Sequence, residues 1–200
     1  EPVQAALARG LRDLLPGEMI ARQRMIATIQ GVYELYGFVP ISTPAIEHLR
    51  VLSGSGGAEA SASIFRVQGP EDDALGLRFD LTVPLARFYA THRAALPVVF
   101  RSIQVAPVWR AERPQKGRYR QFVQCDIDII GEPGIAAEAE LLTATLATVD
   151  ALGLGEASIR INDRRLLIGM LEGFGFAASE QDAVLITIDK LDKIAQDGVI

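Results

Sequence analysis

Hydrophobic residues recur at steps of three and four positions near the start of the chain. From Glu18 to Tyr36 they alternate with polar residues that would lie on the opposite side of a helix. This spacing predicts an amphipathic helix, which Gly37 would end. Phe38 to Ser42 is rich in β-forming residues, but Pro40 and Pro44 confine it to a sheet edge or to a strand that ends abruptly.

Short runs of β-forming residues follow between residues 64 and 130. The expected strands are Ile64 to Val67, Leu75 to Phe79, Val98 to Val105, Val108 to Glu112 and Gln121 to Ile130. Small and polar residues between these runs predict connections at Leu52 to Ser63, Pro70 to Asp73 and Arg113 to Arg120. Each connection is short enough for neighbouring strands to pair.

Two helices are predicted around the last strands. Thr82 to His92 carries Pro84 in its first turn, where the missing N–H of proline is tolerated. Ala136 to Leu152 is followed by Gly153, a residue that favours helix termination. The predicted core face of this second helix consists of Ala139, Leu142, Leu146 and Val149.

The C-terminal part of the chain predicts a strand, a helix and a new unit. Ser158 to Ile161 is the expected strand, and Asp163 would cap a helix that runs to about Glu172. Residues Ser179 to Gln196 would begin a separate unit. Strands joined by short loops, with helices collected elsewhere, indicate the α+β class, with a mainly antiparallel β-sheet flanked by helices.

Composition narrows the partners and the location. With 200 residues, 49% of them hydrophobic, the chain can form one substantial core, and no run is apolar enough for a membrane helix. The net charge of −5 argues against binding nucleic acid through bulk charge. Cys125 is the only cysteine, which excludes an internal disulfide and favours the cytoplasm. His48 and His92 are isolated in the sequence, so no metal site is predicted.

The most informative stretch is Trp109 to Asp128, WRAERPQKGRYRQFVQCDID. Basic residues crowd its first half against the single acidic residue Glu112: they are Arg110, Arg113, Lys116, Arg118 and Arg120. A polyanionic ligand is expected there. Arg110 and Glu112 would share one strand face, where a cation beside an acceptor suits a ligand with a phosphate and an amine-bearing ring.

Polar and apolar residues alternate along Gln121 to Ile130. The apolar side, which includes Cys125, is expected in the core. The polar side cannot be core and faces solvent or a ligand; it consists of Gln124, Asp126 and Asp128. A hydrated sheet face with a charged hairpin is the simpler alternative.

The stretch from Trp109 to Asp128 closely resembles motif 2 of the class II aminoacyl-tRNA synthetases, in the form typical of histidyl-tRNA synthetase. Further segments resemble the same family. GLRDLLP, within Ala8 to Pro16, resembles its entry segment, and GFVPISTPAIEH (Gly37 to His48) resembles motif 1. LRFDLTVPLARFYA (Leu77 to Ala90) resembles the amino-acid-binding segment, INDRRLL (Ile161 to Leu167) the segment after the long helix, and DKLDKI (Asp189 to Ile194) part of the insertion domain.

The resemblance implies a fold and a reaction. Residues 1–175 would form a truncated class II catalytic core that dimerises through Gly37 to His48, and residues 176–200 the incomplete start of an insertion domain. The family activates histidine with ATP, accompanied by Mg²⁺, and transfers it to tRNA(His). Motif 3, a histidine-specific segment and an anticodon-binding domain would follow Ile200. Little or no aminoacylation is therefore expected from these 200 residues alone.

The resemblance also implies residue roles. Arg110 would be catalytic and hold the α-phosphate and the histidine carboxylate. Glu112 would accept from the adenine amine, Phe122 would stack on the adenine ring, and Arg118 would contact the distal phosphates. Asp80, Thr82 and Gln124 would receive the α-ammonium group, and Asp128 would accept from an imidazole N–H. From position alone, Asp80 or Thr82 could equally cap the helix that follows.

Two other functions stay open. The synthetase-like regulatory subunit of ATP phosphoribosyltransferase shares this fold and binds histidine as a sensor. A sensor has no use for an ATP clamp, so the complete run of Arg110, Glu112 and Gly117 to Gln121 favours the synthetase. A dimerisation module without a ligand is the third possibility.

Overall fold

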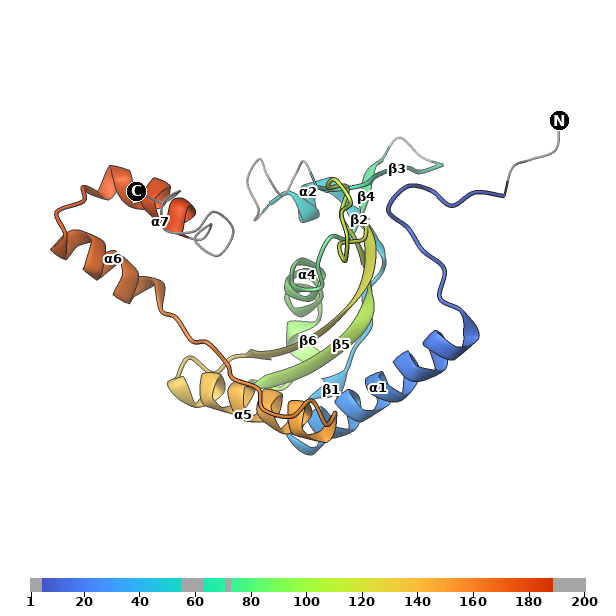
Figure 1. The fold of residues 1–200 in the computed structure, drawn as a ribbon, viewed down its shortest axis with the longest axis horizontal. Coiled ribbons are helices and arrows are strands. Elements are labelled where there is room, and N and C mark those ends of the chain that lie inside the picture. Colours follow the sequence, from blue (N-terminus) through green and yellow to red (C-terminus); the bar gives the residue numbers. More distant parts are fainter. Residues whose placement is uncertain (1–4, 55–62, 71–72, 189–200) are drawn as a thin grey trace. The chain divides into compact units, whose positions relative to one another are not determined.

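The computed structural model describes residues 5–54, 63–70 and 73–188 (Figure 1). The chain divides into two compact units, Glu1–Ala157 and Ser158–Ile200. The division falls before the boundary at residue 175 that the sequence suggested, and both C-terminal helices belong to the second unit. That this unit begins an insertion domain stays a prediction.

The first helix is confirmed. Helix α1 spans Pro16–Leu35, and the chain leaves it through Tyr36 and Gly37, whose φ of 79° is a conformation that glycine adopts easily. At its start the Glu18 carboxylate accepts from the backbone N–H of Leu15 (3.1 Å), and the helix begins two residues earlier than the hydrophobic pattern alone indicated.

The structure contains two three-stranded sheets in its described part. The first has the order β1-β5-β6, with β1 at Val39–Pro40, β5 at Phe100–Trp109 and β6 at Gln121–Ile130. The second has the order β2-β4-β3, with β2 at Ile46–His48, β4 at Ala74–Leu77 and β3 at Arg66–Gln68. All pairs are antiparallel except β1 with β5. The α+β class and the edge position of the proline-flanked strand β1 are confirmed.

One strand replaces two that the sequence predicted. We expected Val98 to Val105 and Val108 to Glu112, but β5 runs without a break from Phe100 to Trp109. The carbonyl of Pro107 accepts from Arg78 Nε (3.0 Å), on the side of β5 that faces away from β6. The missing N–H of Pro107 therefore interrupts no bond between β5 and β6, because N–H and C=O of one residue point to the same side of an antiparallel strand.

Helices cover both faces of the first sheet (Figure 1). Helices α1 and α5 (Ile135–Ala151) pack on one face, against odd-numbered residues of β5 and β6. The core cluster there consists of Tyr33, Phe38, Ile103 and Ala144, and Val105, Ile127 and Ile129 pack against it. Helix α4 (Thr82–His92), which ends in the short 3-10 helix η1 (Arg93–Ala95), lies on the other face; Phe88 of α4 stacks on Phe100 of β5 with ring centroids 6.3 Å apart. The even-numbered residues of β5 and β6 therefore point toward α4.

The predicted core face of α5 is wrong. The helix buries Ala137, Ala144 and Thr148, whereas Leu146 is 43% exposed. Ala137, Ala144 and Thr148 recur at steps of seven and four and so lie on one side of the helix, whereas Leu146, two positions after Ala144, lies on the other. Of the predicted connection from Leu52 to Ser63, residues 55–62 lie outside the described part of the chain, and Leu52 itself ends helix α2 (Leu49–Leu52). The predicted turn at Pro70 to Asp73 also lies partly outside it.

The second unit contains helices α6 (Arg164–Gly173) and α7 (Ala178–Ile188) in its described residues. The Asp163 carboxylate accepts from the backbone N–H of Arg165 (2.8 Å), so the predicted cap is confirmed. The strand expected at Ser158 to Ile161 is wrong, since these residues form no β-ladder. A strand needs a hydrogen-bonded neighbour, and the described part of this unit supplies only helices. Residues 189–196 lie outside the described range.

No helix in residues 5–54, 63–70 and 73–188 combines the length and the apolar character that a membrane span requires.

Candidate active site

The strand register gathers polar side chains on the face that points toward α4. Ser102, Gln104 and Ala106 of β5 lie directly opposite Asp128, Asp126 and Gln124 of β6. Directly opposed residues share one face of a sheet, about 5 Å apart at Cβ. We call this set, Ser102, Gln104, Gln124, Asp126 and Asp128, the polar face. Its β6 residues are those that the alternation predicted.

Three buried polar atoms of the polar face have no hydrogen-bond partner in the described part of the chain. They are Ser102 Oγ, Gln124 Oε1 and Asp128 Oδ2. Ser102 is fully buried. A buried polar atom without a partner costs about 1–3 kcal/mol, so such atoms are rare and their clustering on one face needs a cause. Two of the three atoms can only accept, which points to a ligand that brings N–H donors.

The carboxylates of the polar face resist ionisation. Burial, followed by the charges of Asp126 and Asp80, raises the pKa of Asp128 to about 6. Burial and the charge of Asp80 raise the pKa of Asp126, while Arg110 opposes that shift. Arg110 acts on Asp80 and Asp126 but does not offset the raised pKa of Asp128, so the three neighbouring carboxylates favour a positively charged ligand. No group of three His, Cys, Asp or Glu residues in the described ranges is arranged to hold a metal ion.

Asp80 reaches this region from the turn before α4. Its Oδ1 accepts from the backbone N–H of Val83 (3.1 Å), so the helix-capping alternative is confirmed for one of its two oxygens. Burial raises the pKa of Asp80, and Arg110 lowers it again, which places Asp80 within the field of that cation. Thr82 opens α4 with an exposed side chain, and among the described contacts no hydrogen bond connects it with Asp80, Gln124 or Asp128.

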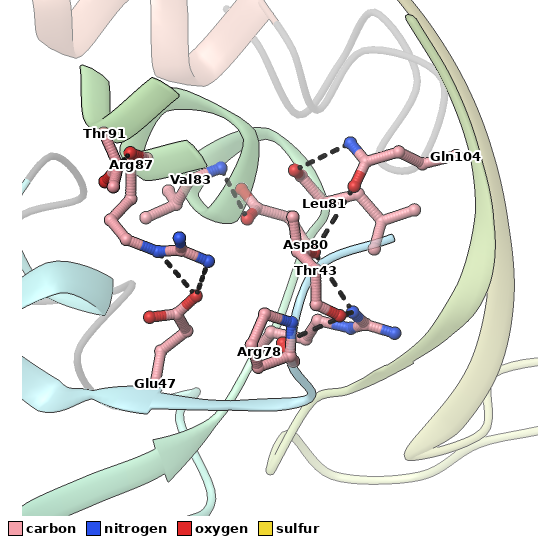
Figure 2. Close-up of polar contacts among 10 residues, drawn as sticks. Thr43, Glu47, Arg78, Asp80, Leu81, Val83, Arg87, Thr91 and Gln104 are labelled. Atoms are coloured by element: carbon pink, nitrogen blue, oxygen red, sulfur yellow. Dashed lines mark hydrogen bonds and ion pairs between the residues drawn. The ribbon is translucent and has the colours of Figure 1, made fainter. Parts of the chain in front are cut away.

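A buried hydrogen-bond network lies beneath the turn that carries Asp80 (Figure 2). Arg78, 4% exposed, donates from Nη1 to the carbonyl of Thr43 (2.6 Å) and to its hydroxyl (3.3 Å). The Thr43 hydroxyl donates to Gln104 Oε1 (3.3 Å), and Gln104 Nε2 donates to the carbonyl of Leu81 (3.2 Å). Side chains from three distant segments therefore hold one short turn.

An ion pair fixes α4 beside this network. Arg87 of α4 donates from Nε (3.0 Å) and Nη2 (2.6 Å) to Glu47 of β2, a residue that is 8% exposed. Charge-assisted contacts of this kind are strong where water is excluded. The start of α4, and with it Asp80, is thereby set against the second sheet.

The loop between β5 and β6 differs from the prediction. Because β5 ends at Trp109, Arg110 and Glu112 do not share a strand face, and the loop begins at Arg110. Arg110 N–H donates to the carbonyl of Arg120 (2.8 Å), but Arg120 N–H donates to Gly10 (2.8 Å) and not back to Arg110, so the ladder ends at this pair. Gly117, at φ 79°, then allows the tight reversal between Gln115 and Arg118.

The loop nevertheless brings the predicted nucleotide residues together. Arg110, Glu112, Arg118 and Phe122 line one cavity of about 210 Å³, together with Arg113, Pro114, Gly117 and Tyr119. The Arg110 guanidinium lies 5.1 Å from the centroid of the Phe122 ring, and its Nε donates to the carbonyl of Phe79 (3.2 Å). Glu112 and Arg118 form an ion pair across the loop (2.8 Å). We call this cavity the hairpin cavity.

Arg120 anchors the loop to the N-terminal segment. Its backbone N–H donates to Gly10 (2.8 Å), its Nη1 to the carbonyl of Arg9 (3.3 Å) and its Nε to the carbonyl of Glu112 (3.0 Å). A Cβ at Gly10 would stand 3.0 Å from the Arg120 side chain, so the close approach needs glycine. Arg120 thus has a structural role that its position in a basic loop did not suggest.

The prediction that Cys125 is a core residue is wrong. Cys125 is exposed and its neighbour Val123 is 38% exposed, whereas Ile127 and Ile129 pack against the core cluster. Alternation placed these residues on the correct face, but α1 and α5 cover only the second half of β6. A period-2 pattern gives the direction of a side chain and not the length of the layer that covers it.

Sequence reasoning missed several residues of the site. Ser102 and Gln104 lie directly opposite Asp128 and Asp126 of β6, and their alternation along β5 was a signal that the sequence analysis did not use. Thr43 and Arg78 gave no signal, because their contact joins segments that are 35 positions apart.

Comparisons with known proteins agree on one family. A family described as "Histidyl-tRNA synthetase" matches residues 10–198. A protein named histidine–tRNA ligase from Leifsonia xyli subsp. xyli is 52% identical over 209 residues, which cover 96% of this chain and 48% of that protein. The chain thus spans about half the length of the curated relatives it matches.

Solved structures show the same fold. The crystal structure of histidyl-tRNA synthetase from Nostoc sp. PCC 7120 matches with a TM-score of 0.85 and 33% identity, over 99% of this chain and 44% of that one. An ATP phosphoribosyltransferase regulatory subunit/histidyl-tRNA synthetase from Bacillus halodurans C matches with a TM-score of 0.67 over 78% of this chain. At 24% identity, this second likeness concerns the fold alone.

Proposed function

This chain belongs to the histidyl-tRNA synthetase family, and on that premise we propose that it supplies the ATP site and part of the histidine site of a histidine–tRNA ligase. The polar face with Asp80 binds histidine, and the hairpin cavity binds ATP. The whole protein would activate histidine to histidyl-adenylate and transfer it to tRNA(His). A homodimer through Gly37 to His48 and a cytoplasmic location complete the proposal.

A single observation carries this assignment: Arg110 belongs to both regions. It lines the hairpin cavity beside Phe122, and it is also the cation whose charge acts on Asp80 and Asp126. A reaction between the carboxylate of one ligand and the phosphate of another needs a cation where the two meet. The contacts of Arg110 with both regions support its assignment as that cation.

Histidine matches the donors that the polar face needs. Its α-ammonium group offers three N–H donors to Asp80 and to the unpaired Oε1 of Gln124, and its imidazole offers an N–H to the unpaired Oδ2 of Asp128. An apolar amino acid of similar size would leave Asp128 unpaired, which costs about 1–3 kcal/mol and disfavours that ligand. Thr82, exposed and apart from these atoms, is the weakest member of the proposed set.

ATP matches the hairpin cavity. Phe122 offers a ring for stacking, the Glu112 carboxylate an acceptor for the adenine amine, and Arg118 a cation for the distal phosphates. Glu112 and Arg118 are paired with each other through Oε2 and Nη2, so both ligand contacts compete with this ion pair. Mg²⁺ would arrive with the triphosphate; the described residues include no carboxylate cluster to hold it, and we assign it no step.

In the proposed reaction, a carboxylate oxygen of histidine attacks the α-phosphorus of ATP. A bond forms between that oxygen and phosphorus, the bond to the bridging oxygen of the β-phosphate breaks, and pyrophosphate leaves. The attacking carboxylate is a weak nucleophile next to the negative triphosphate. The contribution of Arg110 is to neutralise this charge and to hold both groups in line.

The sensor function, in which histidine binds without ATP, remains a second candidate because the regulatory-subunit structure shares the fold. Histidine-dependent exchange between pyrophosphate and ATP, measured on the protein at its natural full length, separates the two. We expect exchange that requires histidine. Histidine binding with no exchange and no ATP binding would favour the sensor and overturn the proposal.

A further inference from the structure

We propose that Thr43 is a positioning residue for histidine binding, acting through Arg78 and Gln104 on the turn that carries Asp80. Thr43 lies between β1 and β2, far from Asp80 in sequence, and does not contact the proposed ligand site. The inference rests on the proposed function, because histidine is the ligand whose affinity it concerns.

Asp80 lies between two carbonyl groups that are held from outside its turn. The carbonyl of Phe79 accepts from Arg110 Nε (3.2 Å), and the carbonyl of Leu81 accepts from Gln104 Nε2 (3.2 Å). The first bond sets the peptide plane that precedes Asp80, and the second sets the plane between Leu81 and Thr82, one residue beyond it. The bond from Val83 N–H sets the Asp80 side chain. The direction of the Asp80 carboxylate therefore depends on whether Gln104 keeps its orientation.

Thr43 determines the orientation of Gln104. An amide side chain can rotate by half a turn and exchange its oxygen and nitrogen, which would present an acceptor to the Leu81 carbonyl. The Thr43 hydroxyl opposes this exchange because it donates to Gln104 Oε1 (3.3 Å), a bond that the exchange would break. The amide nitrogen is then left to face Leu81, as Figure 2 shows.

Arg78 in turn determines the direction of the Thr43 hydroxyl. Arg78 Nη1 donates to the Thr43 oxygen, so the hydroxyl proton has to point elsewhere, and Gln104 Oε1 is the acceptor that it reaches. The backbone of Arg78 is itself fixed, because its N–H donates to Ala45 (2.9 Å) and its carbonyl accepts from Trp109 (3.0 Å). The donor order Arg78, Thr43, Gln104, Leu81 thus has a single consistent direction.

Burial makes this order stiff. Thr43, Arg78 and Gln104 are 6%, 4% and 2% exposed, so water cannot replace a lost bond. A polar network shielded from water holds its geometry when every member is satisfied and loses it when one member is removed. Removal of a single hydroxyl should therefore alter the turn that holds Asp80 while the fold persists.

The test uses Thr43→Val, which keeps the branched shape and removes the hydroxyl. The full-length protein is titrated with histidine and, separately, with ATP by calorimetry. We expect the dissociation constant for histidine to rise roughly tenfold, equivalent to about 1.4 kcal/mol, and that for ATP to change less than about twofold. Thr43→Ser, which restores the hydroxyl, should return histidine affinity to within about twofold of the wild type.

Thr91→Val is the matched control. It removes the same group from the same residue type, but the Thr91 hydroxyl is exposed and donates to the Arg87 carbonyl within α4 (2.8 Å). Histidine affinity should be unchanged. If Thr43→Val reduces the yield of folded protein, Gln104→Met tests the same step. If both variants fold, the double variant should lose no more histidine affinity than the stronger single variant, because both substitutions interrupt the same chain of hydrogen bonds to Leu81.

The outcomes distinguish this inference from the function on which it rests. A wild-type protein that binds no histidine would overturn the proposed function and the inference together. A wild type that binds histidine, with Thr43→Val and Gln104→Met binding it equally well, would overturn the inference alone. Equal losses of histidine and ATP affinity would also overturn it, because they would indicate general damage to the site.

Discussion

The polar face and the hairpin cavity satisfy their polar groups in opposite ways. On the polar face, Gln124 and Asp128 hold buried acceptor atoms without partners. In the hairpin cavity, Glu112 and Arg118 have exposed side chains, 39% and 54%, and pair with each other. Among the described residues, the first region thus offers acceptors without an internal partner, whereas a ligand of the second region competes with an internal contact.

The difference has an energetic meaning. A ligand that donates hydrogen bonds to the polar face pairs its buried acceptors and so removes the free-energy cost of leaving them unpaired. The gain in binding free energy depends on how well single donor and acceptor atoms match. A ligand of the hairpin cavity competes with an exposed ion pair worth only about 0.2–1 kcal/mol, so many anions can do so. We therefore expect selectivity to reside in the polar face, and the reaction to depend on Arg110, which belongs to both regions.

The largest effect is expected at Arg110. Arg110→Met should lower histidine-dependent pyrophosphate exchange by roughly 10²–10³-fold, the usual loss when one group that stabilises developing charge is removed. Arg110→Lys keeps the charge without the planar fork and should recover only part of the rate. A tenfold loss or less in Arg110→Met would contradict the shared role.

The next effect concerns Asp128. Asp128→Asn should weaken histidine binding by about 10- to 100-fold, since a charged hydrogen bond contributes roughly 1.5–3 kcal/mol, and should leave ATP binding unchanged. Calorimetric titration measures both. Asp126→Asn is the control on the same strand face, and we expect a smaller loss. If the two variants weaken histidine equally, only the total charge of the face matters, and the assignment of Asp128 to the imidazole fails.

A third effect is the pH dependence of stability. Asp128 has a folded-state pKa of about 6, above its ordinary value of 3.8, so between these values the folded chain binds more protons than the unfolded chain. The free energy of unfolding should therefore fall as pH rises from about 4 to about 6, by on the order of 1 kcal/mol from this group. Chemical denaturation of wild type and Asp128→Asn at several pH values would show a smaller fall in the variant; parallel curves would refute the raised pKa.

The smallest effect is expected at Arg118. Arg118→Met removes the exposed ion pair with Glu112 and should change the free energy of unfolding by less than about 0.5 kcal/mol. ATP affinity should fall only a few-fold and become less sensitive to salt, because one screened phosphate contact is lost. A large loss of stability would show that the hairpin cavity is as rigidly built as the polar face.

Much of the fold followed from local pattern. Periodicity and a proline in the first turn predicted α4 at its observed limits, and alternation predicted β6 and its polar side. The errors arose where neighbouring strands and helices determine the structure of a segment. Separate strands were predicted before and after Pro107, but its N–H side carries no ladder bond between β5 and β6. Leu146 was predicted on the core face of α5, which Ala137, Ala144 and Thr148 occupy instead.

The site was predictable only in part. Motif resemblance brought Arg110, Glu112, Arg118 and Phe122 together before any coordinates, and they line one cavity. Register, which a single sequence does not contain, was needed to place Ser102 opposite Asp128. Contacts between distant segments, such as that of Arg78 with Thr43, depend on the complete fold.

The most direct test of the two-region account is calorimetric titration of the full-length wild-type protein with histidine and with ATP in separate experiments. Binding of each ligand in the absence of the other is the result that the account predicts, since the polar face and the hairpin cavity have separate side chains and share only Arg110. Binding of histidine alone would reduce the hairpin cavity to a surface feature. If neither ligand binds, histidine is not the ligand of the polar face, and its unpaired acceptors lack the partner proposed for them.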